Sequence, residues 1–498
     1  MRTCRDYQSA CIEKVRDAYR SGRKAVAVEL FTGAGKGYII AAIAKMVIEK
    51  GGRVLVAVNR DNLCEQLFQS LVEQGMLPVM ERGMDKASPL SDLVVGSIQT
   101  MQGERLRKWN RNHFRLVICD EVHFAAANTF KATLDYFADA FHLGLSATVE
   151  RHDKKGLWKG YEEVVFSMPL TSGIEQGWLV PFEFEELPVP IVISDMQQKK
   201  KMWTEKDESE VFSTNDYLPR LFAEAASRVT DRRALFFWPN CDSSMEADRY
   251  FQSAGLNSRH VEGPGGPARM NRDGINELLE WFKEPGPKCL NNADLLSYGY
   301  DNPTIDTIGI MRLSRSIPML KQRLGRGTRP CVPVDNYPTP GERRAAIAAS
   351  VKPACKVLDL MLQLGEVQNK FADATALITE DDAEKRFIRE EMKRAGKPLT
   401  MAEIEGKLVA KRQTDRDKQL ARLAEDAANA ALRKGAKAKE VYVGHILRRA
   451  PEPHWKEASH KQVNYLRKLG YNGVIDSAWH ASRIIDLYIK HHENLQLT

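Results

Sequence analysis

The sequence predicts an α/β protein in which two parallel-sheet domains follow one another and a charged helical segment comes after them. Three observations lead to this prediction. Short apolar runs alternate with stretches of helical periodicity, which is typical of a parallel sheet covered by helices on both faces. A polar, Lys-rich stretch around Gln197–Ser213 interrupts the pattern, which then resumes. After Gly365 the composition changes to Ala, Glu, Lys, Arg, Asp and Leu, which favours helices with charged faces.

The length supports several domains. A chain of 498 residues is too long for one ordinary core, and a scale of about 150 residues per domain gives roughly three. We expect a first α/β domain at residues 1–178, a second at 179–365, a charged helical extension at 366–450 and a small C-terminal helical module at 451–498.

The first domain begins with a predicted helix over about Tyr7–Tyr19. A strand, a Gly-rich turn and a helix through Ile48 follow, and a further helix is expected near Leu63–Val72. The strands expected here are Ala25–Leu30, Val54–Val58, Leu93–Val95, Leu116–Cys119 and His142–Leu145.

The second domain repeats the alternation of strand and helix, which is the pattern of a second parallel sheet. Its predicted strands are Ala234–Phe237, Ser258–Val261, Lys288–Asn291, Thr307–Met311 and Lys356–Leu360.

Composition narrows the class of protein. The net charge of +7 is a mild basic excess that is compatible with binding a polyanion and does not establish it. No two of the eight cysteines have Cys-x-x-Cys spacing, so the sequence signals neither a zinc ribbon nor a redox pair, and free thiols suit a reducing cytosol. No apolar run approaches the ~18 residues of a membrane span, and the first residues lack the apolar stretch of a signal peptide.

A Gly-rich turn, Phe31–Gly37, separates the strand Ala25–Leu30 from the helix that follows. Glycines allow the backbone N–H groups to converge on phosphates, and the start of the helix adds the positive end of its dipole. Lys36 is expected to hold the β and γ phosphates. Position 37 departs from the usual pattern, because Gly37 has no hydroxyl for Mg²⁺; a water molecule filling that place or a weakened ATPase are both open.

Two carboxylates end the strand Leu116–Cys119. Ligands sit at the C-terminal edge of a parallel sheet, so Asp120 is expected to hold Mg²⁺ through water and Glu121 to polarise an attacking water molecule. Small hydroxyl residues, Ser146 and Thr148, follow the next strand, and they are candidates for coupling the nucleotide site to a moving partner domain.

The segment Gln322–Pro330 carries two arginines, Arg326 and Arg329, three positions apart and therefore on one helical face. Across a cleft they would neutralise the charge that develops on a γ-phosphate. A basic surface helix that touches phosphodiesters is the alternative interpretation.

Four such motifs in this order resemble a superfamily 2 helicase of the DExH type. Phe31–Gly37 is similar to motif I with Gly37 as the exception, Asp120–His123 to motif II, Ser146–Thr148 to motif III, and Gln322–Arg329 to motif VI. The pattern is most similar to RadD-like and phage-encoded DNA helicases and covers about residues 1–365.

Weaker matches fill the gaps between these motifs. Arg5–Gln8 resembles the upstream glutamine motif, in which Gln8 would read the adenine edge. Val58–Leu63 with Gln66 resembles motif Ia, Gly96–Thr100 a further motif that contacts nucleic acid, and Asn292–Pro303 motif V.

The resemblance implies two RecA-like domains whose cleft binds ATP and Mg²⁺, and a cycle of closing and opening that moves the protein along one strand. The implied catalytic residues are Lys36, Asp120, Glu121, Gln322, Arg326 and Arg329, with Asp120 holding Mg²⁺. The implied nucleotide-binding residues are Gln8, Thr32, Gly33, Ala34, Gly35, Lys36, Gly37, Gly299 and Asp301. Those implied for nucleic acid are Arg60, Ser97, Gln99, Thr100 and Asn292, and those for coupling are His123, Ser146 and Thr148.

The expected function is therefore an ATP-dependent DNA helicase or translocase of replication, recombination or repair, in the cytoplasm of a bacterial cell or phage-infected host. The expected partner is DNA, single-stranded or with duplex junctions, and replication or repair proteins are possible further partners. Three alternatives stay open: an RNA helicase, a nucleic-acid-binding scaffold with weakened turnover, and the motor subunit of a larger defence or restriction complex. Gly37 favours the scaffold, whereas Glu121 with the paired Arg326 and Arg329 favours an ATPase.

Overall fold

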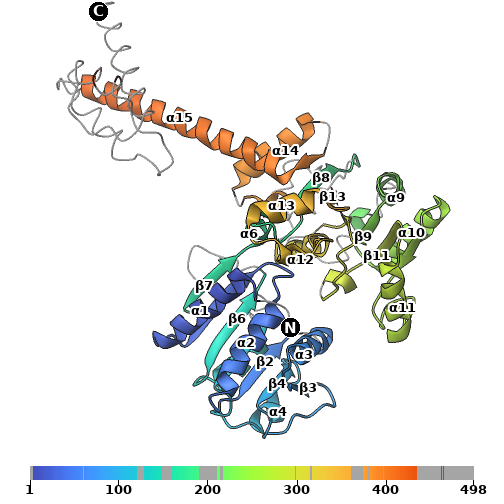
Figure 1. Ribbon diagram of the computed structural model, residues 1–498. Helices are drawn as coiled ribbons and strands as arrows, with labels where there is room; N and C mark the ends of the chain where they lie inside the picture. Colours follow the sequence, from blue (N-terminus) through green and yellow to red (C-terminus); the bar gives the residue numbers. More distant parts are fainter. Residues whose placement is uncertain are drawn as a thin grey trace, which may run out of the picture. The chain divides into compact units, whose positions relative to one another are not determined.

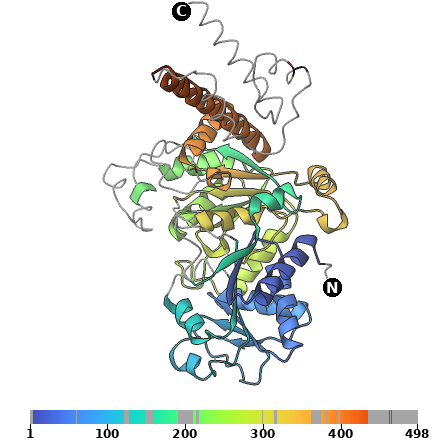
Figure 2. The same ribbon diagram turned by 90° about the vertical axis from the view of Figure 1, so that its left-hand side faces the viewer.

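A computed structural model describes residues 4–59, 61–120, 128–147, 160–189, 210–212, 217–297, 299–313, 317–360, 374–379, 381–395 and 398–433, together with residues 461 and 464. The chain divides into two compact units, Met1–Glu405 and Gly406–Thr498. The first unit contains both sheets (Figures 1 and 2).

The first sheet has the strand order β3-β4-β2-β5-β6-β1-β7, and all its neighbouring strands are parallel. Every residue of β2 and β4 is buried, as expected of central strands with helices on both faces. Helix α2 packs against α1 and α3. The strands are β1 (Ala25–Leu30), β2 (Val54–Val58), β3 (Val79–Glu81), β4 (Leu93–Ser97), β5 (Leu116–Asp120), β6 (Phe141–Ser146) and β7 (Glu163–Met168).

The helices around this sheet follow the predicted apolar periodicity. In α1 the buried residues recur at helical spacing, from Tyr7 through Cys11, Val15 and Ala18, so one face of the helix packs on the domain. The helices are α1 (Asp6–Arg20), α2 (Lys36–Ile48), α3 (Asp61–Glu73), α4 (Gly103–Arg107), α5 (Asn128–Tyr136) and α6 (Leu170–Glu175).

The second sheet has the order β10-β11-β9-β12-β13-β8-β14 and is parallel except for β14 at its edge. The strands are β8 (Phe182–Glu186), β9 (Arg233–Phe237), β10 (Ser258–His260), β11 (Lys288–Asn292), β12 (Thr307–Ile310), β13 (Cys355–Asp359) and β14 (Leu399–Thr400). The helices and 3-10 turns are α9 (Tyr217–Ser227), α10 (Cys241–Ser253), α11 (Arg272–Lys283), η2 (Leu295–Ser297), α12 (Ile317–Leu324), η3 (Gly325–Gly327), η4 (Val334–Asn336), α13 (Pro340–Ala348), η7 (Ala374–Leu377) and α14 (Asp382–Ala395).

Local signals in the sequence start several of these helices. The Asn240 side chain accepts a hydrogen bond from the Ser243 N–H at 2.8 Å and caps α10. Thr339 and Glu342 form a capping box at α13, with Pro340 at its first turn. The core of the second sheet includes Trp238, which is fully buried and therefore a packing residue rather than a base-stacking one.

Every predicted strand is present, with ends that differ by at most two residues. Four strands were not predicted: β3, β7, β8 and β14. β3 and β14 are short, most positions of β7 are half-exposed, and β8 carries glutamates at half-exposed positions. These strands therefore lack the buried apolar runs of the central strands.

The charged region after Gly365 is helical in its described part, as predicted, and ends in α15 (Met401–Arg433). One correction is needed within the predicted helical extension, because Leu399 and Thr400 form β14, which pairs antiparallel with β8. The Lys-rich stretch lies largely, and the C-terminal module almost entirely, outside the described residues. Within the described residues, no helix has the length and apolar character that crossing a bilayer requires.

Candidate nucleotide site between the two sheets

The Gly-rich turn joins the C-terminal end of β1 to the start of α2. Gly33 and Gly35 have φ angles of +94° and +75°, which side chains rarely adopt, so glycine is needed at both positions. No side chain caps α2, whose N-cap is Gly35. The first N–H groups of a helix have no partners within it, and this end is therefore suited to bind phosphate.

The start of α1 holds this turn in place. The Tyr7 hydroxyl and the Gln8 side-chain amide both donate to the Ala34 carbonyl, at 2.9 and 2.8 Å. The Gln8 side-chain oxygen, Oε1, accepts a hydrogen bond from the Arg5 backbone N–H at 3.0 Å. Gln8 is 5% exposed. The predicted contact of Gln8 with adenine stays a prediction, and the structure adds a second role in which Gln8 fixes the phosphate-binding turn.

Lys36 and Asp120 come together at the carboxyl edge of the first sheet. Their Nζ and Oδ1 atoms are 3.7 Å apart, and both side chains are 14% exposed. Because β1 and β5 are separated only by β6, residues far apart in the sequence end at the same edge. An ammonium group beside a carboxylate at a helix N-terminus is a suitable donor set for a phosphate chain with a divalent cation.

Several predicted residues cannot be placed. Arg60, Glu121, His123 and Thr148 lie outside the described residues. Ser146 ends β6 and is fully buried beside Glu29 of β1 in the register of the sheet.

Arg329 connects the two predicted domains. Its Nη1 donates to the Gly33 carbonyl at 2.9 Å, and its Nη2 pairs with Asp301 Oδ2 at 3.1 Å. A Cβ built on Gly33 would lie 2.5 Å from the Arg329 Cζ, so only glycine permits this approach. Nearby, a Cβ on Gly325 would lie 2.8 Å from the Thr32 Cβ. The segment around Arg329 thus closes directly over the phosphate-binding turn.

Arg326 contacts its own domain in this structure. Its Nη1 donates to the Tyr300 carbonyl at 2.7 Å and its Nη2 to the Ser297 carbonyl at 2.9 Å. Gln322, one turn earlier in α12, is 2% exposed. Arg329 therefore contacts the phosphate-binding turn, whereas Arg326 holds the loop after η2.

Sequence reasoning missed an ion-pair cluster beside these residues. Arg323 is 2% exposed, and its Nη2 lies 2.6 Å from Asp294 Oδ1, while Arg312 Nη1 lies 3.1 Å from the same oxygen. Burial raises the pKa of Asp294, but the two guanidinium groups outweigh burial and hold the pKa below its usual range. The cluster ties β12 and α12 to the loop after β11.

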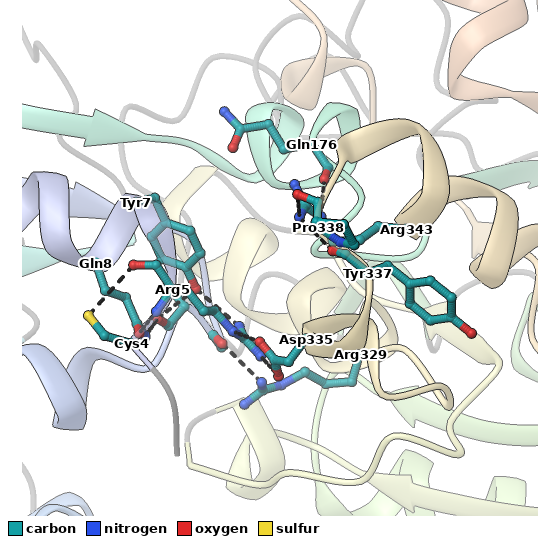
Figure 3. A network of polar contacts seen from close by, with 12 residues as sticks. Cys4, Arg5, Tyr7, Gln8, Gln176, Arg329, Asp335, Tyr337, Pro338 and Arg343 are labelled. Carbon is teal, nitrogen blue, oxygen red and sulfur yellow. Dashed lines mark hydrogen bonds and ion pairs between the residues drawn. The ribbon is translucent and has the colours of Figure 1, made fainter. Parts of the chain in front are cut away.

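A second network joins the start of the chain to the segment after η3. Arg5 makes a bidentate contact with Asp335, with Nε–Oδ1 at 2.6 Å and Nη2–Oδ2 at 2.9 Å (Figure 3). Burial lowers the pKa of Arg5, but the hydrogen bonds to Asp335 and Tyr7 raise it above its ordinary value. Trp178 lies against the guanidinium groups of Arg5 and Arg343, at 4.9 and 3.9 Å from its ring centre.

Arg343 also binds the connection between the sheets. Its Nε donates to the Gln176 carbonyl at 2.8 Å, and its Nη1 donates to the carbonyls of Tyr337 and Pro338 at 3.0 Å. Figure 3 shows Arg343 of α13 with Gln176, Tyr337 and Pro338. The segment after α6, which leads from the first sheet to the second, is thus fixed to α13 of the second domain.

The residues predicted to contact nucleic acid separate into two groups. Gln99 is exposed and Thr100 is half-buried after β4, and the Gln99 side chain donates to Asn59 at the end of β2. The other two need correction as direct contacts, because Ser97 and Asn292 are fully buried. The Ser97 hydroxyl donates to the Gln99 side chain at 2.8 Å and so positions this exposed residue. The Asn292 side chain donates to the Phe236 carbonyl at 2.8 Å and so joins β11 to β9.

Comparisons with known proteins agree with this geometry. The family model for the res subunit of type III restriction enzymes (ResIII) matches residues 2–151. The protein irc3 of Schizosaccharomyces pombe, a candidate mitochondrial ATP-dependent helicase, is 29% identical over 344 residues, which cover 65% of this chain and 55% of irc3. Over these residues the chain is similar to superfamily 2 helicases.

Other relatives extend the comparison. The endonuclease subunit of the type I restriction enzyme EcoAI from Escherichia coli is 23% identical over 362 residues, which cover 65% of this chain and 44% of the subunit. The chain spans about half the length of the relatives it matches, 55% and 49% for the irc3 proteins of S. pombe and Saccharomyces cerevisiae. A particular closeness to RadD-like helicases stays a prediction.

A solved structure has the same fold. The ATP-dependent type ISP restriction-modification enzyme LlaBIII, bound to DNA, superimposes with a TM-score of 0.52 and 15% identity over 72% of this chain and 27% of LlaBIII. The two sheets of the chain are therefore RecA-like domains in tandem.

Proposed function

We propose that this chain is a DNA-dependent ATPase that uses ATP and Mg²⁺ to move along or unwind DNA in replication, recombination or repair. The observation that carries the proposal is the convergence of three charged groups on the turn between β1 and α2. Lys36 and Asp120 approach it from the first sheet, and Arg329 reaches it from the second. A module that only binds nucleic acid has no use for this arrangement.

Each group has a distinct role in the proposal. Lys36 binds the β and γ phosphates, and Arg329 neutralises the charge that develops as the terminal phosphate leaves. Asp120 would hold Mg²⁺, which would help to neutralise the phosphate oxygens, and Glu121 would orient the attacking water molecule. Gln8, Tyr7 and the α1 contacts keep the turn in position.

Closure of the two domains would couple hydrolysis to movement. The contacts of Arg329 with Gly33 and of Gly325 with Thr32 join the second domain to the first. Loss of a phosphate between the two domains would change these contacts. Gln99 and Thr100, with Arg60, would hold the sugar–phosphate backbone, and this kind of binding is independent of base sequence and weakens with salt.

DNA is the favoured substrate because one relative is a restriction endonuclease subunit and the matching family model is named for another restriction enzyme. The test is ATP hydrolysis by purified protein with Mg²⁺, alone or with single-stranded DNA, duplex DNA or single-stranded RNA. Stimulation by DNA well above that by RNA supports the proposal. Stronger stimulation by RNA indicates an RNA helicase, and binding without hydrolysis under every condition indicates a scaffold.

A second candidate is the motor subunit of a restriction or defence complex, which the EcoAI relative favours because that protein is itself described as a subunit. Affinity purification of the tagged chain from its own host tests this candidate. A stoichiometric nuclease or methyltransferase partner supports it, and a chain that purifies alone and is fully stimulated by DNA contradicts it.

A further inference from the structure

The turn that binds phosphate lacks one functional group. Superfamily 2 helicases carry Ser or Thr directly after the lysine of this turn, and this chain carries Gly37. The hydroxyl at that position is an oxygen donor for Mg²⁺, a cation that binds oxygen ligands in near-octahedral geometry. In the proposed ATPase this oxygen comes either from a water molecule or from another side chain.

Ser70 of α3 occupies the space that a side chain at position 37 would fill. A Cβ built on Gly37 would lie 3.1 Å from the Ser70 Cβ, and the Ser70 hydroxyl oxygen lies closer still. A side chain at position 37 would require the Ser70 hydroxyl to rotate away and the two helices to shift slightly. The chain thus has one hydroxyl in this space, and it is supplied by α3 instead of α2.

The face of α3 that carries Ser70 also contacts a loop of the second sheet. Gln66 is one turn earlier on the same helix, and residues four positions apart share a helical face. The Gln66 Cδ lies 2.7 Å from a Cβ built on Gly299, which belongs to the loop held by Arg326. Ser70 is half-buried.

We propose that the Ser70 hydroxyl takes the place of the missing residue-37 hydroxyl as an oxygen ligand of the Mg²⁺ that accompanies ATP. The inference rests on the proposed function and names a residue of the same site. It explains how a chain with Gly37 retains a complete donor set, with Asp120 on β5 and Ser70 on α3. Gly37 and Ser70 then form a reciprocal pair, in which the hydroxyl has moved from one helix to its neighbour.

The test measures binding of a fluorescent ATP analogue as a function of Mg²⁺ concentration, with steady-state hydrolysis as a second readout. Ser70→Ala is expected to raise the half-saturating Mg²⁺ concentration by about tenfold, the scale of loss found when a group supporting a metal is removed. The double variant Gly37→Ser/Ser70→Ala returns the hydroxyl to α2 and is expected to recover most of the loss. The matched control is Ser253→Ala in α10, whose hydroxyl only donates to the Tyr250 carbonyl at 2.7 Å.

Ser70→Cys tests ligation if Ser70→Ala does not fold. A thiol disfavours Mg²⁺ and accepts softer cations, so binding of the analogue should be weak with Mg²⁺ and should recover with Mn²⁺ or Cd²⁺ relative to wild type. Equal Mg²⁺ dependence in wild type and Ser70→Ala, or no difference between metals for Ser70→Cys, overturns the role of Ser70 and leaves the proposed function intact. A wild-type protein that binds no nucleotide in any metal overturns both.

Discussion

Replacing Arg329 with Ala removes a guanidinium group that bridges the second sheet to the phosphate-binding turn. The side chain is 28% exposed and makes a hydrogen bond to the Gly33 carbonyl and an ion pair with Asp301. A hydrogen bond of this kind contributes about 1 kcal/mol to the free energy of unfolding, and an exposed ion pair about 0–1 kcal/mol. The variant should therefore lose only about 1–2 kcal/mol of stability.

The effect on hydrolysis should be much larger. Arginines that neutralise phosphoryl transfer are worth about 10³–10⁵ in rate, which corresponds to about 4–7 kcal/mol in the activation free energy. We expect Arg329→Ala to lower kcat by at least about 10³ while nucleotide affinity changes little, since the contribution is made mainly in the transition state. Arg329→Lys keeps the charge and loses the fork geometry of the guanidinium group, so its kcat should lie between those of wild type and Arg329→Ala.

Steady-state hydrolysis with saturating DNA, paired with urea unfolding of the same preparations, separates the two effects. Arg326→Ala is a useful comparison, because Arg326 holds the Ser297 and Tyr300 carbonyls and its loss should reduce both stability and turnover. A kcat for Arg329→Ala within tenfold of wild type, at unchanged fold stability, would refute the assignment of Arg329.

Three further predictions concern single residues. Lys36→Ala should abolish hydrolysis and weaken nucleotide binding, as measured by filter binding, and retention of wild-type turnover would exclude this turn as the site. Asp294→Ala should destabilise the second sheet by about 2 kcal/mol in urea unfolding, less than the about 3–5 kcal/mol of a fully buried pair because the Asp294 side chain is 42% exposed. Because the pKa of Asp294 is lowered in the folded protein, the stability that Asp294 contributes is present above the unfolded pKa of about 3.9 and is lost as pH falls through the folded pKa. The control is Glu280→Ala, which removes an exposed pair with Lys283 and should cost under about 1 kcal/mol. Gly325→Val should block closure against Thr32 and reduce DNA-stimulated hydrolysis, whereas Gly341→Val, where a Cβ meets nothing within 4 Å, should have a much smaller effect on turnover.

The central strands were predictable because each is a continuous apolar run that only a sheet buried on both faces can accommodate. The edge strand β7 is half-exposed, and β8 alternates apolar residues with glutamates, so neither has that pattern. The two-residue β14 has no pattern of its own and depends entirely on its pairing with β8.

The site was predictable where its residues lie in continuous motifs. Lys36, Asp120 and Arg329 belong to such motifs, and the structure brings them to one turn. Contacts between distant segments were not predictable, because nothing in the sequence links Arg5 to Asp335. Burial was also missed, as for Asn292, for which the resemblance to motif V implied a contact with nucleic acid although its side chain links β11 to β9.

The central claim, that this chain couples ATP hydrolysis to movement along DNA, is tested most directly by the dependence of hydrolysis on DNA length. The measurement is the steady-state rate with saturating single-stranded and duplex DNA of increasing length, at constant salt, with RNA as comparison. A motor that dissociates at DNA ends should hydrolyse faster as the DNA lengthens, up to a plateau. Stimulation that is independent of length, or no stimulation by DNA, would contradict the account.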